Sequence, residues 1–174
     1  MAEQRAGRVR VGLGYDRHRM APVAAQSGER GREMVMGGVV FQYAQGPVAH
    51  SDGDALMHAI TDGVLGAVGL PDIGQLFPDR DPKWSGAKSE VFLAEAVRLA
   101  GEQGWVVGNV DATVIVEGPK IGPRKEEVRQ NLARILSVDV ECVNVKGKTH
   151  ELTEKTEIDP YIEAMAVVLM ERAV

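Results

Sequence analysis

Residues 50–62, HSDGDALMHAITD, join a polar loop to the start of an amphipathic helix. If HSDGD closes the loop, Asp54, His58 and Asp62 follow at intervals of four residues and share one face of the helix. The apolar positions of the segment and its continuation can pack on a sheet: Leu56, Ile60, Val64 and Leu65. The pattern predicts a helix that turns a polar stripe toward a cleft.

A second polar fragment, GYDRH, ends at His18 and closes the apolar run RVRVGLGY. Asp16 and His18 are two residues apart, so at the end of a strand their side chains point to the same side. With His58 they make one carboxylate and two imidazoles, and three protein ligands with an open fourth position are typical of catalytic zinc sites. From the residues alone, a solvated strand end and a helix histidine that only forms hydrogen bonds remain the alternative.

Composition limits the class of protein. The 174 residues, 44% hydrophobic and 26% charged, suffice for one domain with a buried core. A net charge of −5 without a long basic run argues against nucleic acid as a partner. The N-terminal sequence MAEQRAGRVRVG lacks the apolar run of a secretory signal, and no stretch approaches the ~20 apolar residues of a membrane span. We therefore expect a soluble cytoplasmic protein with no membrane partner, and Cys142 as a buried thiol in a strand.

Strand and helix patterns alternate along the chain without an internal repeat. The expected strands are RVRVGLGY (8–15), MVMGGVVFQY (34–43, bent at its glycines), VVGNVDATVIV (106–116) and CVNVKGKT (142–149). The expected helices cover residues 53–68, residues 88–103, a segment after Pro123 and PYIEAMAVVLMERAV (160–174). This order predicts an α/β or α+β single domain, residues 1–174, with one mixed sheet covered on one side by helices. Residues 1–8 are expected to be flexible, and the long loop 69–86 to be functional.

Five motifs follow one another between Arg10 and Val145: G-[YF]-D-x-H, AHSDGD-x(3)-H, DIG-x-LFPD-x-D, GNVD and PK-x-x-P. In this order and spacing the chain resembles the 2-C-methyl-D-erythritol 2,4-cyclodiphosphate synthase family of the non-mevalonate isoprenoid pathway. The resemblance implies a homotrimer with active sites between subunits, a zinc ion or another divalent transition metal, and a second cation, Mg²⁺ or Mn²⁺. It implies a phosphorus-oxygen lyase that cyclises 4-diphosphocytidyl-2-C-methyl-D-erythritol 2-phosphate and releases CMP.

The resemblance also implies roles for single residues. Asp16, His18 and His58 correspond to the zinc ligands, Glu151 to a ligand of the second cation, and His50 and Thr149 to catalytic residues that contact the phosphates. The residues implied in substrate binding are Asp16, His18, His50, Ser51, Asp72, Ile73, Gly74, Phe77, Pro78, Asp79, Arg80 and Asp81. Those implied in nucleotide binding are Val116, Glu117, Gly118, Pro119, Lys120, Ile121, Gly122, Lys148 and Thr149.

Two features keep other functions open. Residues 116–122 could be an ordinary helix start with a proline just inside it.

From Lys146 onward the sequence KGKTHEL replaces the family's alanine and threonines, and residues 152–162 lack its Leu-Gly-Phe-Thr-Gly-Arg-x-Glu-Gly pattern. Lys155, Ile158 and Pro160 stand where the family binds isoprenoid diphosphates, so we expect no such binding. A paralogue that is non-catalytic or acts on another nucleotide or phosphoester, and a metal-dependent phosphohydrolase, remain alternatives.

Overall fold

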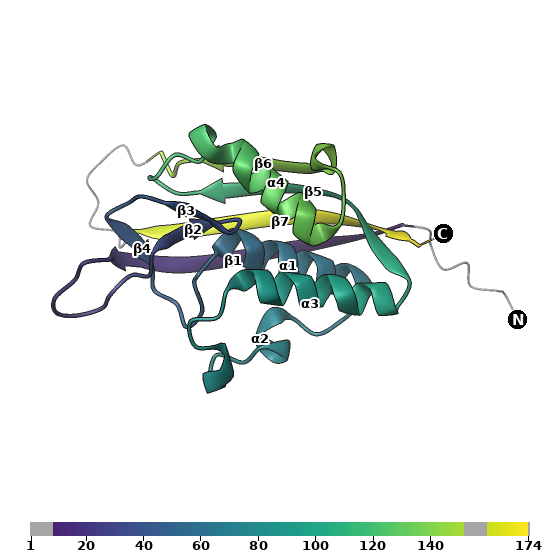
Figure 1. Ribbon diagram of the computed structural model, residues 1–174, viewed down its shortest axis with the longest axis horizontal. Helices are drawn as coiled ribbons and strands as arrows, with labels where there is room; N and C mark the ends of the chain where they lie inside the picture. Colours follow the sequence, from purple (N-terminus) through teal and green to yellow (C-terminus); the bar gives the residue numbers. More distant parts are fainter. Residues whose placement is uncertain (1–8, 152–159, 174) are drawn as a thin grey trace, which may run out of the picture.

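The computed structural model describes residues 9–151 and 160–173. Its centre is a five-stranded sheet with the strand order β4-β1-β7-β5-β6 (Figure 1). β5 and β6 run parallel, whereas the other neighbouring strands run antiparallel, so the sheet is mixed. The strands of this sheet are β1 (Val9–Pro22), β4 (Gln45–Pro47), β5 (Trp105–Ile115), β6 (Val143–Lys148) and β7 (Tyr161–Arg172).

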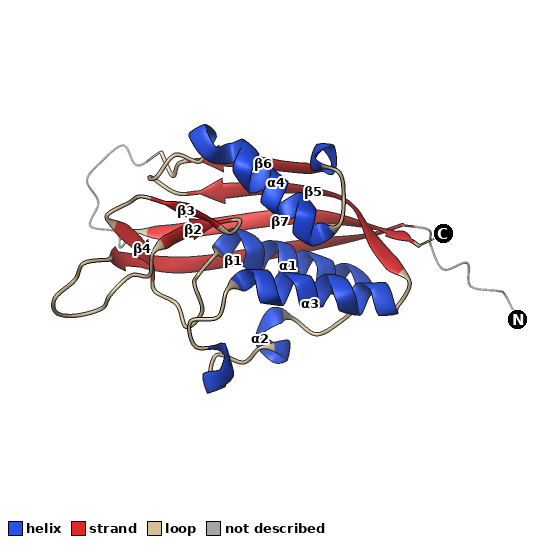
Figure 2. Ribbon diagram, in the orientation of Figure 1, coloured by secondary structure: helices blue, strands red, loops and turns tan. Residues whose placement is uncertain are grey.

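Three long helices lie on one side of the sheet (Figure 2). They are α1 (Ala55–Val68), α3 (Ser89–Glu102) and α4 (Lys125–Leu136). The shorter elements are the hairpin β2 (Met34–Met36) and β3 (Val39–Phe41), the helix α2 (Ile73–Leu76), and single 3₁₀ turns at Pro82–Trp84, Gly122–Arg124 and Val140–Cys142. The prediction of a single domain with a mixed sheet covered on one side by helices is confirmed. Within the described ranges, no helix is both long and apolar enough to cross a bilayer.

The core lies between the sheet and the helices. Every second residue of β7 is buried there: Ile162, Ala164, Ala166, Val168 and Met170. α1 is buried on nearly all sides, because it lies between the sheet and α3. Burying a side chain of the size of Val or Leu contributes about 1.5–3 kcal/mol, so α1 and the central strands form the rigid base of the molecule.

Two glycines of β1 let α1 lie directly on the sheet. A Cβ atom added at Gly12 would fall 1.9 Å from the carbonyl oxygen of Gly63, and one at Gly14 would fall 1.8 Å from that of Ala59. No real Cβ atom fits at such distances. The motif GLGY therefore serves close packing between strand and helix, which brings His58 on α1 next to β1.

The last predicted helix is wrong. Residues 161–172 form β7, which pairs with β1 on one side and β5 on the other. Ala, Met, Leu and Glu favour helices, but the buried residues of this segment recur with the strand period of two. Burial of that face at the centre of the sheet outweighs the helix propensity.

Three smaller predictions also need correction. Residues 34–43 form a hairpin instead of one bent strand, with Gly37 and Gly38 at φ +59° and +76° in a two-residue turn. β1 continues to Pro22, so Asp16 and His18 lie inside a strand and not at its end. Cys142 lies half-buried in a 3₁₀ turn before β6 instead of inside the strand. The expectations for residues 1–8, Lys155 and Ile158 concern positions outside the described residues.

Candidate functional site

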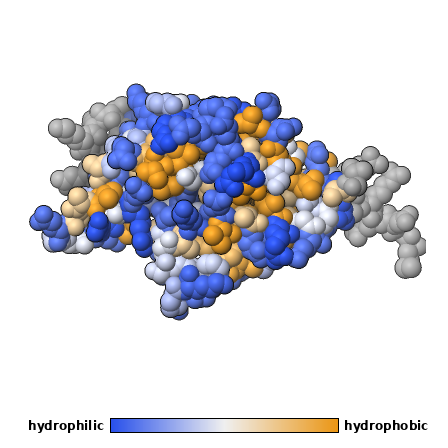
Figure 3. Space-filling model, in the orientation of Figure 1, coloured by the Kyte–Doolittle hydropathy of each residue, from blue (hydrophilic) through white to orange (hydrophobic). Residues whose placement is uncertain are grey.

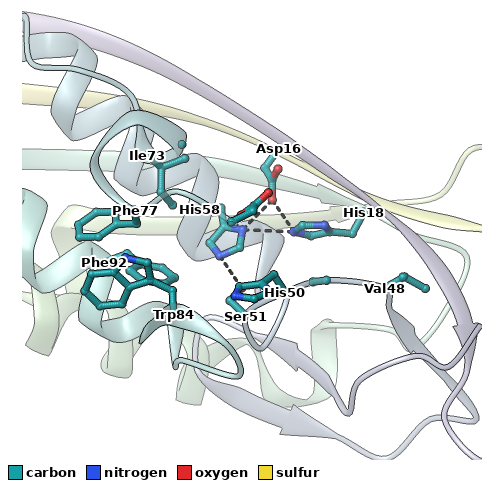
Figure 4. A pocket seen from close by; sticks show the side chains of 13 residues that line it. Asp16, His18, Val48, His50, Ser51, His58, Ile73, Phe77, Trp84 and Phe92 are labelled. Atoms are coloured by element: carbon teal, nitrogen blue, oxygen red, sulfur yellow. Dashed lines mark hydrogen bonds and ion pairs between the residues drawn. The ribbon is translucent and has the colours of Figure 1, made fainter. Parts of the chain in front are cut away.

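Three side chains from two elements converge beside α1 (Figure 4). Asp16 and His18 extend from β1 toward the helices, and His58 extends from α1. Asp16 Oδ2 lies 2.9 Å from His18 Nε2 and 3.0 Å from His58 Nδ1, and the two ring nitrogens are 3.2 Å apart. One oxygen and two nitrogens that meet in this way can hold a divalent metal ion. The structure therefore brings together the three predicted zinc ligands.

The charges of this cluster are strongly coupled. Burial works to raise the pKa of Asp16, but hydrogen bonds from His18 and His58 outweigh it and hold the pKa well below its usual range. Burial likewise works to lower the pKa of His58, but the hydrogen bond and negative charge of Asp16 outweigh it and raise the pKa. Asp16 is therefore a carboxylate at neutral pH, ready to meet a cation.

Of the polar stripe predicted on α1, only His58 lines the cavity that is described next. Asp54 is the fully buried N-cap of α1, where it accepts hydrogen bonds from the backbone N–H groups of Met57, Gly37 and Gly38. Burial raises the pKa of its carboxyl, although these hydrogen bonds work against the rise. Asp62 accepts a hydrogen bond from Ile73 N at 2.8 Å. Both residues hold the framework of the site, which corrects the expectation that the whole stripe faces a cleft.

The converging side chains line a cavity of about 410 Å³. Eight of the predicted substrate-binding residues line it: Asp16, His18, His50, Ser51, Ile73, Gly74, Phe77 and Asp79. Asp72 and Asp81 instead cap α2 and the following 3₁₀ turn, through hydrogen bonds from Gln75 N and Lys83 N. Pro78 and Arg80 do not line the cavity either.

The loop formed by residues 50–52 supplies two lining residues of this cavity and is held by hydrogen bonds. Arg32 donates hydrogen bonds to the carbonyl oxygens of Ala49 (3.2 Å) and His50 (3.0 Å), and the His50 carbonyl also accepts one from Gly86 N (2.8 Å). His50 Nε2 is shielded from solvent and has no hydrogen-bond partner in the part of the chain that the structure describes. An unpaired buried nitrogen is costly, so this imidazole is available to a polar ligand group.

A second cavity, of about 490 Å³, lies near the ends of β5 and β6. Seven predicted nucleotide-binding residues line it, together with Glu151: Val116, Pro119, Lys120, Ile121, Gly122, Lys148 and Thr149. Glu117 and Gly118 do not line it: the Glu117 carboxylate accepts a hydrogen bond from His150 N (2.8 Å), and Gly118 packs against Tyr43. Thr149 donates a hydrogen bond to Glu151 at 2.9 Å. Lys146 and Lys125 add further positive charge to the lining.

Comparison with known proteins bears on these two cavities. A model of the YgbB family matches residues 9–171. The chain belongs to the YgbB family. The chloroplastic 2-C-methyl-D-erythritol 2,4-cyclodiphosphate synthase of Arabidopsis thaliana is 48% identical over 161 residues, which are 92% of this chain and 66% of the relative. The synthase of Dechloromonas aromatica (strain RCB) is 47% identical over 163 residues, 94% of this chain and 97% of the relative.

Solved structures agree with the YgbB assignment. A structure named as the CDP-bound form of 2C-methyl-D-erythritol-2,4-cyclodiphosphate synthase matches with a TM-score of 0.81 at 38% identity, over 93% of this chain and 100% of that one. The resemblance inferred from five motifs is confirmed. The chain spans just under two thirds of the length of the Arabidopsis relative, at 66%.

The cavity that contains Asp16, His18 and His58 is here called the metal cavity. Four further residues line it that the sequence did not predict: Val48, Ala49, Trp84 and Phe92. The rings of Phe77, Trp84 and Phe92 form one aromatic cluster, with ring centroids 4.7–5.5 Å apart. Phe92 also lies 6.1 Å from the ring of His58. An aromatic wall limits water around charged groups. The tryptophan of PKW and the phenylalanine of VFLAEA are visible in the sequence, but no motif assigns either residue to the site.

Proposed function

We propose that this YgbB-family chain cyclises 4-diphosphocytidyl-2-C-methyl-D-erythritol 2-phosphate to 2-C-methyl-D-erythritol 2,4-cyclodiphosphate and releases CMP, as a phosphorus-oxygen lyase. The convergence of Asp16, His18 and His58, in a family whose named relatives are that synthase, carries the proposal. The 2-phosphate of the substrate attacks the β-phosphorus of its own diphosphate, and CMP leaves in line. Two anions must approach each other, so charge neutralisation and positioning are what the protein has to provide.

The donor set fits zinc. Asp16, His18 and His58 would hold the ion beside the cavity, and zinc bound there would supply Lewis acidity that withdraws negative charge from a phosphate. Glu151 would hold a second cation, Mg²⁺ or Mn²⁺, for which carboxylate oxygen is a suitable ligand. Replacing His58 by Ala should remove most bound zinc, whereas Asp62→Asn, which alters a contact to Ile73 N, should retain it. Metal analysis of the two variants checks the ligand set.

The remaining residues have roles that follow from their chemistry. His50, with its unpaired buried Nε2, and Ser51 would donate hydrogen bonds to the attacking phosphate and keep it near the diphosphate. Ile73, Gly74 and Phe77 would contact the carbon chain of the substrate. No protein nucleophile is required, because the substrate supplies its own phosphate oxygen.

The second cavity would bind the cytidine diphosphate part. Its lining combines Val116 and residues 119–122, which include Lys120, with Lys148 and Thr149. Backbone groups can pair with a base edge, and lysines and a hydroxyl suit phosphates. The structure of a relative named as CDP-bound supports a nucleotide diphosphate as the ligand.

We propose that the active protein is a homotrimer in which the metal cavity of one subunit meets the nucleotide cavity of the next. On one chain the two cavities share no lining residue, and β7 separates β1 from β5 and β6. Two to three strand spacings are roughly 10–14 Å, so one subunit presents the two halves apart. The side of the sheet opposite the helices, here called the open face, carries exposed apolar residues on β1 and β7: Val11, Leu13, Tyr15, Met165 and Val167. Such a patch suits a subunit interface.

One alternative function has an observation in its favour. The sequence after Lys146 departs from the family pattern, and Lys148, Thr149 and Glu151 of that segment line the nucleotide cavity. A paralogue that acts on another nucleotide or phosphoester, or on none, would keep the metal cavity and change this segment. Incubation with the cytidyl substrate, zinc and magnesium distinguishes the proposed enzyme from such a paralogue. The proposed enzyme releases CMP and gives the phosphorus spectrum of a cyclic diphosphate. Intact substrate after incubation with zinc-loaded protein would contradict the proposal.

The cellular compartment stays a prediction. We propose the cytoplasm, while the Arabidopsis relative is named as chloroplastic. Fractionation of the native cell with detection of this chain would decide between these compartments.

A further inference from the structure

A chain of buried polar groups leads away from the metal cavity behind His58. The hydroxyl of Ser89, the first residue of α3, lies 2.8 Å from His58 Nε2 and is fully buried. The same hydroxyl forms a short hydrogen bond to Asp52 Oδ1, and the other oxygen of Asp52 accepts the Ser89 backbone N–H at 3.0 Å. Asp52 and Ser89 lie outside the set of residues to which the sequence assigned a role in the site.

The proton positions in this chain follow from what each group can donate. A carboxylate accepts hydrogen bonds only, so the single hydroxyl hydrogen of Ser89 points to Asp52. The lone pairs of the Ser89 oxygen then face His58, so His58 Nε2 must carry a hydrogen and donate it. Ser51 Oγ is a weaker partner, because it lies 3.4 Å from the same nitrogen and already accepts a hydrogen bond from Gly53 N.

We infer that Asp52 and Ser89 are positioning residues that fix the Nε2–H form and the ring orientation of His58, so that its Nδ1 lone pair faces the metal position between Asp16 and His18. This inference rests on the proposed metal site and extends it to two residues. A ligating histidine whose second nitrogen is held by a partner binds metal more tightly, because tautomer and orientation are set beforehand. Loss of such a partner typically weakens metal binding about 10- to 100-fold.

The same contacts connect the metal cavity to the loop that carries His50. Asp52 N donates a hydrogen bond to the Ala87 carbonyl at 3.0 Å, just before α3 begins. Asp52 therefore joins the His50–Asp52 loop to the start of α3 and, through Ser89, to His58. A bound metal would gain its third ligand in a fixed orientation relative to the proposed phosphate-binding loop.

Two variants separate this role from simple stabilisation of α3. Ser89→Ala removes the acceptor of the His58 Nε2 hydrogen. Asp52→Asn keeps the shape but puts an NH₂ group in place of one carboxylate oxygen, and the two oxygens accept the backbone N–H groups of Asp54 and Ser89 as well as the Ser89 hydroxyl. With the NH₂ group at the Oδ1 position, the amide donates to Ser89, which frees the serine hydroxyl to donate to His58 and favours the other tautomer. Thr61→Val is the matched control, since Thr61 is also a fully buried hydroxyl on the helix of His58 but donates to the Met57 carbonyl.

The test measures zinc affinity of the full chain by competition with a chromophoric chelator, and the proton on His58 Nε2 by ¹⁵N NMR of histidine-labelled protein, which has four histidines. We expect about 10- to 100-fold weaker zinc binding for Ser89→Ala and Asp52→Asn, wild-type affinity for Thr61→Val, and an Nε2–H signal in the wild type that Asp52→Asn loses. If Ser89→Ala does not fold, Asp52→Asn and the wild-type spectrum still decide.

Unchanged zinc affinity in Asp52→Asn, or a wild-type His58 without hydrogen on Nε2, would overturn the inference. A wild-type chain that binds no zinc would overturn it as well. The proposed reaction fails separately: wild-type protein that binds zinc but releases no CMP contradicts the enzyme activity and leaves the role of Ser89 and Asp52 intact.

Discussion

Gly14 of β1 lies against the backbone carbonyl of Ala59 in α1, the residue that follows His58. A Cβ atom at position 14 would come within 1.8 Å of that oxygen and within 2.7 Å of Gly63 N. Both obstacles are backbone atoms, which cannot rotate away as a side chain can. The distance between α1 and β1, and with it the distance between His58 and Asp16, therefore depends on the absence of a side chain at this position.

Gly14→Ala should destabilise the fold by about 1–3 kcal/mol, the usual cost of forcing extra atoms into a packed core. It should also weaken zinc binding, because α1 must move away from β1 and take His58 with it. Urea unfolding and zinc titration measure the two effects. The matched control is Gly66→Ala, because Gly66 lies within α1 but is exposed, with no atom within 4 Å of the added Cβ. That variant should gain about 0.5–1 kcal/mol, since glycine is unfavourable inside a helix. Equal stability of the two variants would refute the packing argument.

Sequence patterns predicted the parts of this protein that depend on local periodicity. The helix 53–68 was expected within two residues of α1, and the spacing of Asp16 and His18 correctly placed both side chains on one side of a strand. β7 was missed, because its helix-forming residues occupy a strand whose neighbours lie far away in the sequence. Ser89 and Asp52 were missed for the same reason: 37 residues separate them, and only the packing of α3 against α1 brings them together.

At pH values below the pKa of His58 in the folded protein, zinc binding should release a proton. Asp16 raises that pKa, and in the metal-free protein this stabilises the fold most below pH 6.5, the ordinary value for histidine. The contribution is lost as the pH rises through the folded pKa. Zinc must displace the proton on Nδ1, so its affinity should rise by up to about tenfold per pH unit and level off above the folded pKa. Calorimetry in two buffers of different ionisation enthalpy measures the released proton, and heats independent of the buffer at pH 6 would contradict this assignment.

Leu13→Glu should convert the proposed trimer into monomers. Leu13 is 70% exposed on the open face, beside Val167 of β7, so the charge costs the isolated chain little but would be buried without a partner in an assembly. The mass measured by light scattering should fall from that of three chains to that of one. Val91→Glu is the matched control, because Val91 is exposed on α3 on the helical side, whose surface is partly hydrophilic in Figure 3, and it should leave the mass unchanged. A wild-type protein that is already monomeric and fully active would rule out sites shared between subunits.

Lys120→Ala should weaken CDP binding without affecting zinc binding. Lys120 lines the second cavity, where its ammonium group is exposed and can reach a diphosphate. Because the lysine is exposed, the expected loss is about 1 kcal/mol, roughly fivefold in the dissociation constant. The difference between wild type and variant should shrink as salt is added, since screening weakens an exposed charge pair. Lys88→Ala is the control, because Lys88 lines a different cavity, together with Arg32 and Glu90. Calorimetric titration with CDP measures the affinity of both variants. If the two substitutions weaken CDP binding equally, the nucleotide responds only to overall charge and not to the cavity at the ends of β5 and β6.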